Sequence, residues 1–307
     1  MLINLVAWVV SFTCGITLQR RLRDPRHASH TLFLISLWIA APLVVLYAYT
    51  TVVVQVELFA ALAAVVLASW ITLLVGMIWG RLSGLERHRG GVLAFATCIG
   101  NTGTLGFPLT TIVFGGPGLA IAVLYTEFQY LIPVDGVILG LGRHYAGPAS
   151  RSTPAPGARR LIRSWLLNPP VVAGAIAVAL RLLHVDITAL VSPIGPVMGL
   201  VFGLLGFLQL GLATPLKPLA HDRGELWRAG LTIVLRSVMA PLILFGIGGL
   251  LGVHIPGVFL LLAAMPVAFN TMVVSAVFDL DTELARLLIA VSTPLVVAGV
   301  LIWQVLT

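Results

Sequence analysis

The sequence predicts an all-α polytopic membrane protein, with ten transmembrane helices arranged as a 5+5 inverted repeat. Two observations lead to this prediction. The 307 residues are 59% hydrophobic and only 9% charged, whereas soluble domains are about a quarter charged. A soluble core of this length could not enclose so many apolar side chains. The apolar residues also gather in separate runs, each close to the ~20 residues that cross a bilayer as a helix.

Ten such runs follow one another, separated by polar loops. The first run lacks the basic start and the Ala-x-Ala cleavage site of a signal peptide, so we interpret it as a transmembrane span. The predicted spans are 2–19, 29–50, 57–80, 90–114, 117–141, 164–184, 188–213, 229–251, 255–277 and 284–305.

The basic residues give the expected orientation. Loops after spans 1, 3, 5 and 7 contain several arginines or a lysine, whereas those after spans 2, 4 and 8 contain neither. Basic loops stay in the cytoplasm, so both termini are expected outside a multi-pass inner (plasma) membrane protein, on the periplasmic side. The net charge of +7 is distributed over these short loops, which argues against nucleic acid as a partner.

A segment rich in glycine and proline, residues 146–163, has the composition of a cytoplasmic linker. It divides the chain into a first repeat, 1–145, and a second repeat, 164–307, with five spans each. Because five is an odd number, the two repeats insert with opposite orientations. This reasoning predicts the inverted repeat.

Two polar segments interrupt the apolar runs near the middle of spans 4 and 9. They are Cys98–Pro108 and Met265–Thr271, and each combines proline with an Asn-Thr pair. Proline removes a backbone donor and breaks a helix. Irregular backbone at membrane depth is tolerated only where it meets protein or a watery cavity. Matching positions in the two halves favour a transporter substrate site. The alternative is ordinary proline kinks, with the asparagines bonding neighbouring helices.

The chemistry of these segments suits a carboxylate. The amino ends of half-helices present partial positive charge, and asparagine amides both donate and accept. No arginine is expected at membrane depth beside them, which favours a substrate with a single carboxylate. The predicted substrate-binding residues are Asn101, Thr102, Gly103, Pro108, Pro266, Asn270 and Thr271.

These segments resemble a known family. Asn101–Pro108 is similar to the Asn-Thr-x-x-x-Gly-Ile-Pro segment of plant auxin efflux carriers and their bacterial relatives. Met265–Asn270 and Asp279–Ala285 resemble the Met-Pro-x-x-x-Asn and Leu-Asp-x-Glu-Leu-Ala motifs of the bacterial members. Leu166–Pro170 fits as well, so the resemblance extends over nearly the whole chain.

The resemblance implies a fold like those of the NhaA antiporter and the bile-acid transporters, in which broken helices 4 and 9 cross near Pro108 and Pro266. A scaffold domain would contain helices 1, 2, 6 and 7 and form a homodimer. A transport domain would contain helices 3–5 and 8–10 and move as an elevator. The implied substrates are small organic anions, such as auxin-like aromatic acids, malonate or malate, with the carboxylate against Asn101.

Three ionisable residues are predicted at membrane depth, where such groups are often functional: Glu127, Asp135 and Arg236. Glu127 has no evident partner at its depth, so it is a candidate proton carrier or a structural hydrogen-bonding group. Asp135 and Arg236 lie at similar depths and are expected to pair, either structurally or as a proton- or substrate-sensitive latch.

Other functions are less compatible with the sequence. It has no ATP-binding loop, and no span contains a His-Glu-x-x-His, Gly-x-Gly-Asp or Gly-x-Ser-x-Gly motif, so we expect neither an ATP-driven pump nor an enzyme. Neither a cofactor nor a metal is expected. The rival predictions are a sodium- or proton-coupled symporter of the bile-acid type and a membrane receptor that binds a ligand without moving it.

Overall fold

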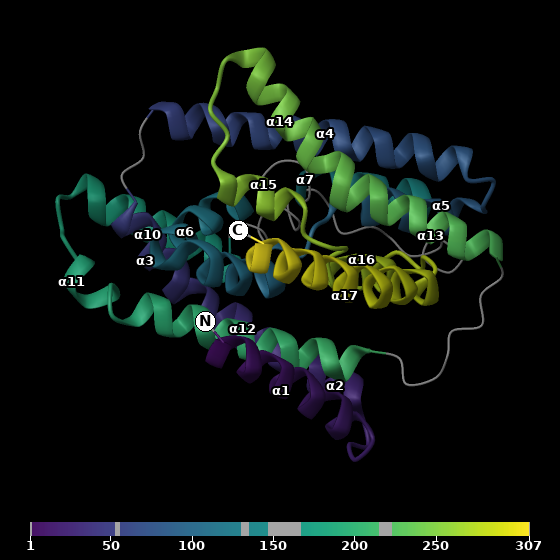
Figure 1. Cartoon of the computed structure of the whole chain (residues 1–307), viewed down its shortest axis with the longest axis horizontal. Coiled ribbons are helices and arrows are strands. Elements are labelled where there is room, and N and C mark those ends of the chain that lie inside the picture. Colours follow the sequence, from purple (N-terminus) through teal and green to yellow (C-terminus); the bar gives the residue numbers. More distant parts are fainter. Residues whose placement is uncertain (1, 53–55, 130–134, 147–166, 215–222, 307) are drawn as a thin grey trace. The chain divides into compact units, whose positions relative to one another are not determined.

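The structure is a computed structural model that describes residues 2–52, 56–129, 135–146, 167–214 and 223–306. Within these ranges the named elements are all helices (Figure 1). The chain forms two compact units, each assembled from three separate stretches. Unit 1 comprises Met1–Val54, Gly103–Leu124 and Pro156–Leu216, and unit 2 comprises Gln55–Thr102, Tyr125–Ala155 and Lys217–Thr307.

Unit 1 is organised around a long hydrophobic helix, α12, which packs against α1, α2 and α3. Figure 1 shows α1 running beside α12. The Trp8 ring stacks on Phe207 with 5.4 Å between the ring centres. Gly211 brings the two backbones together, because a Cβ added there would overlap the carbonyl oxygen of Phe12. The helices are α1 (Leu2–Gln19), α2 (Pro25–Ile35), α3 (Ala41–Thr51), α10 (Pro169–Leu182), α11 (Thr188–Val191) and α12 (Ile194–Ala213).

Unit 2 is built around α5, which packs against α4, α13, α16 and α17. Small residues allow the close approach of α4 and α5, since a Cβ added to Gly90 would lie 2.7 Å from the carbonyl oxygen of Gly80. The helices are α4 (Val56–Leu82), α5 (Arg87–Cys98), α7 (Asp135–Tyr145), α13 (Arg223–Val234), α14 (Ala240–Leu251), α15 (Gly257–Ala263), α16 (Asn270–Val277) and α17 (Thr282–Leu306).

Within the described residues, three π-helical segments interrupt the helices: η1 (Ser36–Ala40), η2 (Thr102–Gly106) and η4 (Leu235–Met239). A proline lies two residues beyond each of them, at Pro42, Pro108 and Pro241. Proline lacks an N–H group, and its ring clashes with the carbonyl four residues earlier. The wider π turn relieves this clash and lets the helix continue. Proline positions in the sequence therefore explain where the π segments form.

The remaining helix, α6 (Phe107–Gln129), contains a sharp turn at Gly115. Its backbone angles there, φ 70° and ψ −164°, are accessible in practice only to glycine. The segments on the two sides of this turn correspond to the end of predicted span 4 and the start of span 5. The turn thus lies at the predicted boundary between these two spans, although Thr102–Gln129 as a whole is also long and apolar enough to be one span.

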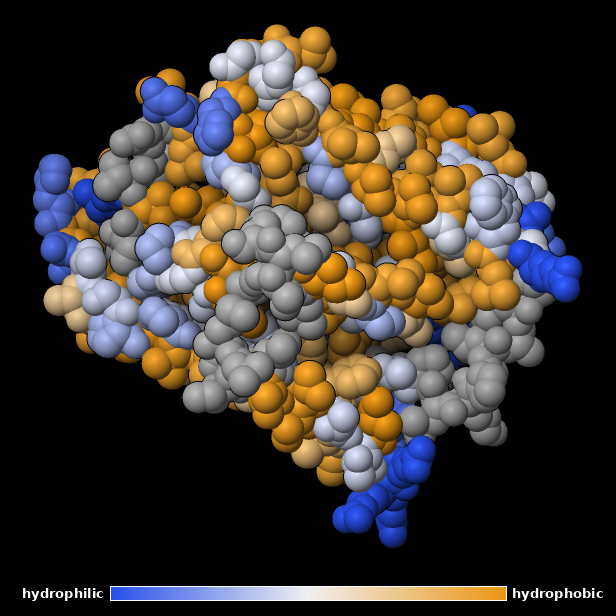
Figure 2. All heavy atoms as spheres, viewed as in Figure 1, coloured by the Kyte–Doolittle hydropathy of each residue, from blue (hydrophilic) through white to orange (hydrophobic). Residues whose placement is uncertain are grey.

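Six helices among the described residues are long and apolar enough to cross a membrane, and α10 and most of α1 are shorter apolar helices. Large hydrophobic side chains are exposed on α4 and α14, including Phe59, Leu74 and Phe245, and Figure 2 shows hydrophobic residues over much of the visible face. The chain is thus a helical, polytopic membrane protein.

The predicted number of ten spans stays a prediction. The helix breaks divide spans 4 and 9 into pieces, and residues 130–134 of span 5 lie outside the described ranges. The six are His27–Tyr49, Val56–Leu82, Thr102–Gln129, Thr188–Leu212, Arg223–Leu251 and Thr282–Val300.

Candidate functional site

Both predicted helix breaks are present in unit 2. Helix α5 ends at Cys98, and the following residue, Ile99, has an extended backbone with φ −89° and ψ 107°. Helix α15 ends at Ala263, and α16 begins only at Asn270. The chain therefore leaves the helical conformation where proline and glycine in the two Asn-Thr segments predicted it.

The two breaks are joined by hydrogen bonds as a short antiparallel bridge between Gly100 and Val267. The Asn101 N–H donates to the carbonyl oxygen of Pro266 at 2.8 Å, and the Ala268 N–H donates to that of Ile99 at 3.0 Å. Each segment thus provides hydrogen-bond partners for backbone groups that lost theirs at the other helix break. At membrane depth such groups need partners within the protein, because no water is available there. We refer to this paired region, residues 99–102 and 264–271, as the crossover.

Arg236 anchors the crossover from η4. Its side chain is 1% exposed, and it donates from Nε to the carbonyl oxygen of Met265 and from Nη1 to that of Cys98, both at 3.1 Å. The Cys98 carbonyl is at the carboxyl end of α5, and the Met265 carbonyl lies two residues beyond the end of α15, so both are close to the partial negative charge of a helix dipole. One guanidinium therefore compensates the ends of two half-helices.

This geometry corrects the expectation that no arginine lies at the crossover. The position of Arg236 along its span can be predicted from the sequence. That position does not specify which groups the side chain contacts. The predicted Asp135–Arg236 ion pair stays a prediction, because the Asp135 side chain lies outside the described part of the structure.

Three buried polar groups at the crossover are left without a hydrogen-bond partner among the residues that the structure describes. They are the Nδ2 group of Asn101 and the hydroxyls of Thr102 and Thr271. The three side chains are at most 4% exposed. Buried polar groups are normally hydrogen-bonded, and leaving one unsatisfied costs about 1–3 kcal/mol. Three unsatisfied groups beside a helix break are therefore suited to binding a polar ligand.

Other polar residues complete the surroundings of the second break. Pro266 is buried, and Asn270 is half-buried at the start of α16. From α17, the Ser292 hydroxyl accepts a hydrogen bond from the Val267 N–H at 3.2 Å, and the adjacent Thr293 is buried as well. The sequence analysis missed Ser292 and Thr293, although a Ser-Thr pair before Pro294 in the middle of an apolar span was a usable signal.

Gly103 and Pro108, which were also predicted to bind substrate, belong to unit 1 and contact α12 there. A Cβ on Gly103 would lie 3.7 Å from the Phe202 ring, and Pro108 packs on Gly203. The Phe107 and Phe202 rings lie 5.5 Å apart. Within unit 1 these two residues take part in packing, whereas the other five predicted residues lie in unit 2.

Glu127, the candidate proton carrier, is half-buried on the part of α6 that belongs to unit 2. The sequence suggested no partner for it, but Glu127 does interact with another group of the chain. Its assignment to proton coupling therefore needs a functional test.

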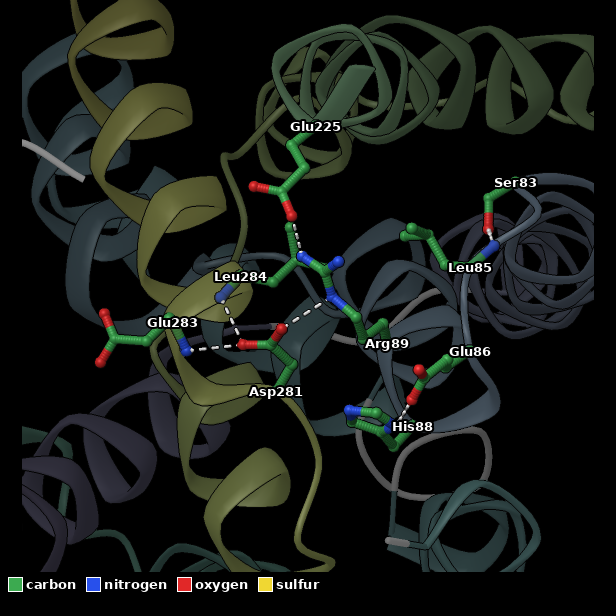
Figure 3. A network of polar contacts seen from close by, with 9 residues as sticks. All are labelled: Ser83, Leu85, Glu86, His88, Arg89, Glu225, Asp281, Glu283 and Leu284. Atoms are coloured by element: carbon green, nitrogen blue, oxygen red, sulfur yellow. Dashed lines mark hydrogen bonds and ion pairs between the residues drawn. The ribbon is translucent and has the colours of Figure 1, made fainter. Parts of the chain in front are cut away.

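A charge network lies at the other end of α5 (Figure 3). Arg89 forms ion pairs with Glu225 at the start of α13 and, at 2.8 Å, with Asp281 before α17. Asp281 also accepts hydrogen bonds from the backbone N–H groups of Glu283 and Leu284, which caps α17. Burial lowers the pKa of Arg89, but its bonds to the two carboxylates outweigh this effect and raise the pKa overall. Arg89 is therefore a permanently charged link between three helices.

Two archaeal transporters are similar to this chain in sequence. No protein-family profile matches the chain. An uncharacterized transporter of Methanothermobacter thermautotrophicus is 28% identical over 235 residues, which cover 75% of this chain and 72% of that protein. An uncharacterized transporter of Methanocaldococcus jannaschii is 23% identical over 227 residues, which cover 71% and 69% of the two chains. The chain is thus similar to archaeal transporters, and its apolar helices agree with that similarity.

Proposed function

We propose that the chain is a secondary transporter of small organic anions and that the crossover binds the carboxylate of the substrate. The observation that supports this proposal most directly is the group of buried, unsatisfied donors at the crossover: Asn101 Nδ2 and the hydroxyls of Thr102 and Thr271. Similarity to archaeal transporters and the resemblance to auxin efflux carriers support it independently.

The chemistry of the crossover favours an anion over a cation. Its unsatisfied amide and hydroxyl groups can donate hydrogen bonds to carboxylate oxygens. The amino end of α16 adds partial positive charge beside Thr271. Neutral donors bind a carboxylate reversibly, which a transporter needs because the substrate has to leave on the opposite side of the membrane.

The wider architecture follows from the same proposal. We propose that helices 3–5 and 8–10, which contain the crossover, move as a transport domain against a dimeric scaffold of helices 1, 2, 6 and 7, in an elevator mechanism with opposite orientations of the two repeats. Both termini would lie outside a plasma membrane. Auxin-like aromatic acids and small dicarboxylates such as malonate or malate are the substrate classes to test first.

The test is transport current from proteoliposomes on a solid-supported membrane, across a panel of mono- and dicarboxylates. Asn101→Ala should raise the half-saturating concentration of a transported carboxylate by about ten- to a hundredfold, which is the loss of one hydrogen bond to a charged group. Gln209→Ala is the matched control, because it removes a buried amide from α12 in unit 1. Wild-type protein that gives neither current nor counterflow of any labelled carboxylate would contradict the proposal and favour a receptor.

A sodium- or proton-coupled symporter of the bile-acid type is the alternative. It differs in requiring an ion gradient, so the current should be measured with and without sodium and at several pH differences. If Glu127 carries the proton, Glu127→Gln should transport the substrate with no dependence on the pH gradient. Unchanged pH dependence in that variant would remove Glu127 from the coupling mechanism.

A further inference from the structure

We propose that Arg236 determines the charge selectivity of the crossover, as a positioning residue that acts through the two carbonyls it binds. The inference rests on the proposed function and deepens it. Arg236 would do more than hold the helices together, because its charge decides whether the site prefers an anion to a neutral molecule of the same shape.

The first step concerns the charge at the crossover without Arg236. Carbonyls at the carboxyl ends of α5 and α15 would present negative partial charge beside the bridge, and this would repel a carboxylate. Arg236 donates to one carbonyl at each end, Cys98 and Met265. Cys98 is only three residues before Asn101, and Met265 adjoins Pro266. The positive charge of Arg236 thus offsets partial negative charge close to the unsatisfied donors.

The second step concerns how the local fold makes room for the guanidinium. A Cβ on Gly100 would overlap the Arg236 guanidinium, so the crossover contains glycine where the arginine approaches most closely. Arg236 also lies in the π segment η4, on a buried stripe with Thr232 and Ala240. Contacts of η4 with α5 keep this stripe against the first broken helix.

A merely structural role and a selectivity role differ in their consequences. A structural defect weakens binding of every ligand equally. Loss of the charge weakens binding of the anion alone, so the ratio between the affinities for a carboxylate and for its uncharged amide analogue reports on Arg236 specifically. Guanidinium and ammonium groups both supply charge, whereas glutamine supplies only hydrogen bonds.

The experiment compares wild type, Arg236→Gln and Arg236→Lys, using a carboxylate that wild type transports and its amide as a competitor. Wild type showing no transport of any carboxylate would be a failure of the proposed function and not of this inference. With transport established, Arg236→Gln should raise the half-saturating concentration of the carboxylate by about tenfold while leaving inhibition by the amide unchanged. Arg236→Lys should keep the wild-type preference for the anion.

Arg228→Gln is the matched control, because Arg228 lies on the same helix and also donates to a carbonyl, that of Ser83, at 2.9 Å. It should leave the ratio of affinities unchanged. An unchanged ratio in folded Arg236→Gln would overturn the inference. If that variant does not fold, Arg236→Lys decides, because loss of the anion preference in folded protein that retains the charge would contradict a role for charge.

Discussion

Replacing Gly100 with alanine should destabilise the protein by about 3 kcal/mol or more and abolish transport. The added methyl group would overlap the guanidinium of Arg236, which has almost no exposed surface and is held by two carbonyls. Either the arginine gives up its hydrogen bonds or the bridge to Val267 opens. Gly100 does not have a positive φ, so the effect comes from this contact and not from the backbone conformation. Thermal unfolding in detergent and transport current measure the two consequences.

Gly246→Ala and Gly249→Ala are the controls, because a Cβ at either position on α14 would meet no atom within 4 Å. Alanine is a better helix former than glycine by about 1 kcal/mol, so these variants should be as stable as wild type or slightly more stable. A Gly100→Ala protein that melts and transports like wild type would mean that Arg236 does not occupy its place beside the crossover.

Replacing Asp281 with alanine should lower the free energy of unfolding by about 2–3 kcal/mol. The helix cap of α17 contributes about 1 kcal/mol of this, and the partly buried pair with Arg89 contributes the rest. Bonds to the two carboxylates raise the pKa of Arg89, so its guanidinium stays charged across the physiological pH range. Reversible unfolding in mixed micelles, titrated with a denaturing detergent, measures the difference.

Two further variants separate the contributions of the cap and the ion pair. Asp281→Asn keeps a good capping group and removes the charge, so its loss of stability should be smaller than that of Asp281→Ala. Glu283→Gln is the control, because Glu283 is exposed and pairs with its neighbour on the helix, Arg286. Its effect should stay within about 0.5 kcal/mol. Equal stability of Asp281→Ala and wild type would show that the cap and the ion pair made by Asp281 in Figure 3 contribute nothing.

Much of the crossover could be predicted from the sequence. Proline, glycine and Asn-Thr pairs in the middle of apolar runs are poor choices for an uninterrupted helix, and both helices do break there. The Asp281-Thr282-Glu283 motif also has a physical explanation, since Asp281 caps α17. In each case the residue types at a position determine its backbone conformation, so that conformation can be predicted from the sequence.

The contacts of Arg236 could not be predicted in the same way. A span can be located from hydropathy, but the direction of one side chain depends on the rotation and packing of its helix, and the π segment η4 changes both. The Ser-Thr pair before Pro294 could have been noticed in the sequence, but the hydrogen bond of Ser292 to the second break depends on α17 lying against it. The sequence predicts where a residue lies along its helix, whereas its contacts with other helices depend on how the helices pack.

The wide sequence separation at the crossover affects how the protein is made. The Cys98 carbonyl and the Arg236 side chain that binds it lie 138 residues apart. At ribosomal speeds of roughly 5–20 residues per second, the end of α5 waits on the order of 10 s for this partner. During that time its polar backbone groups have no partner from the second half of the chain. The crossover can therefore assemble only after the second half of the chain has been made.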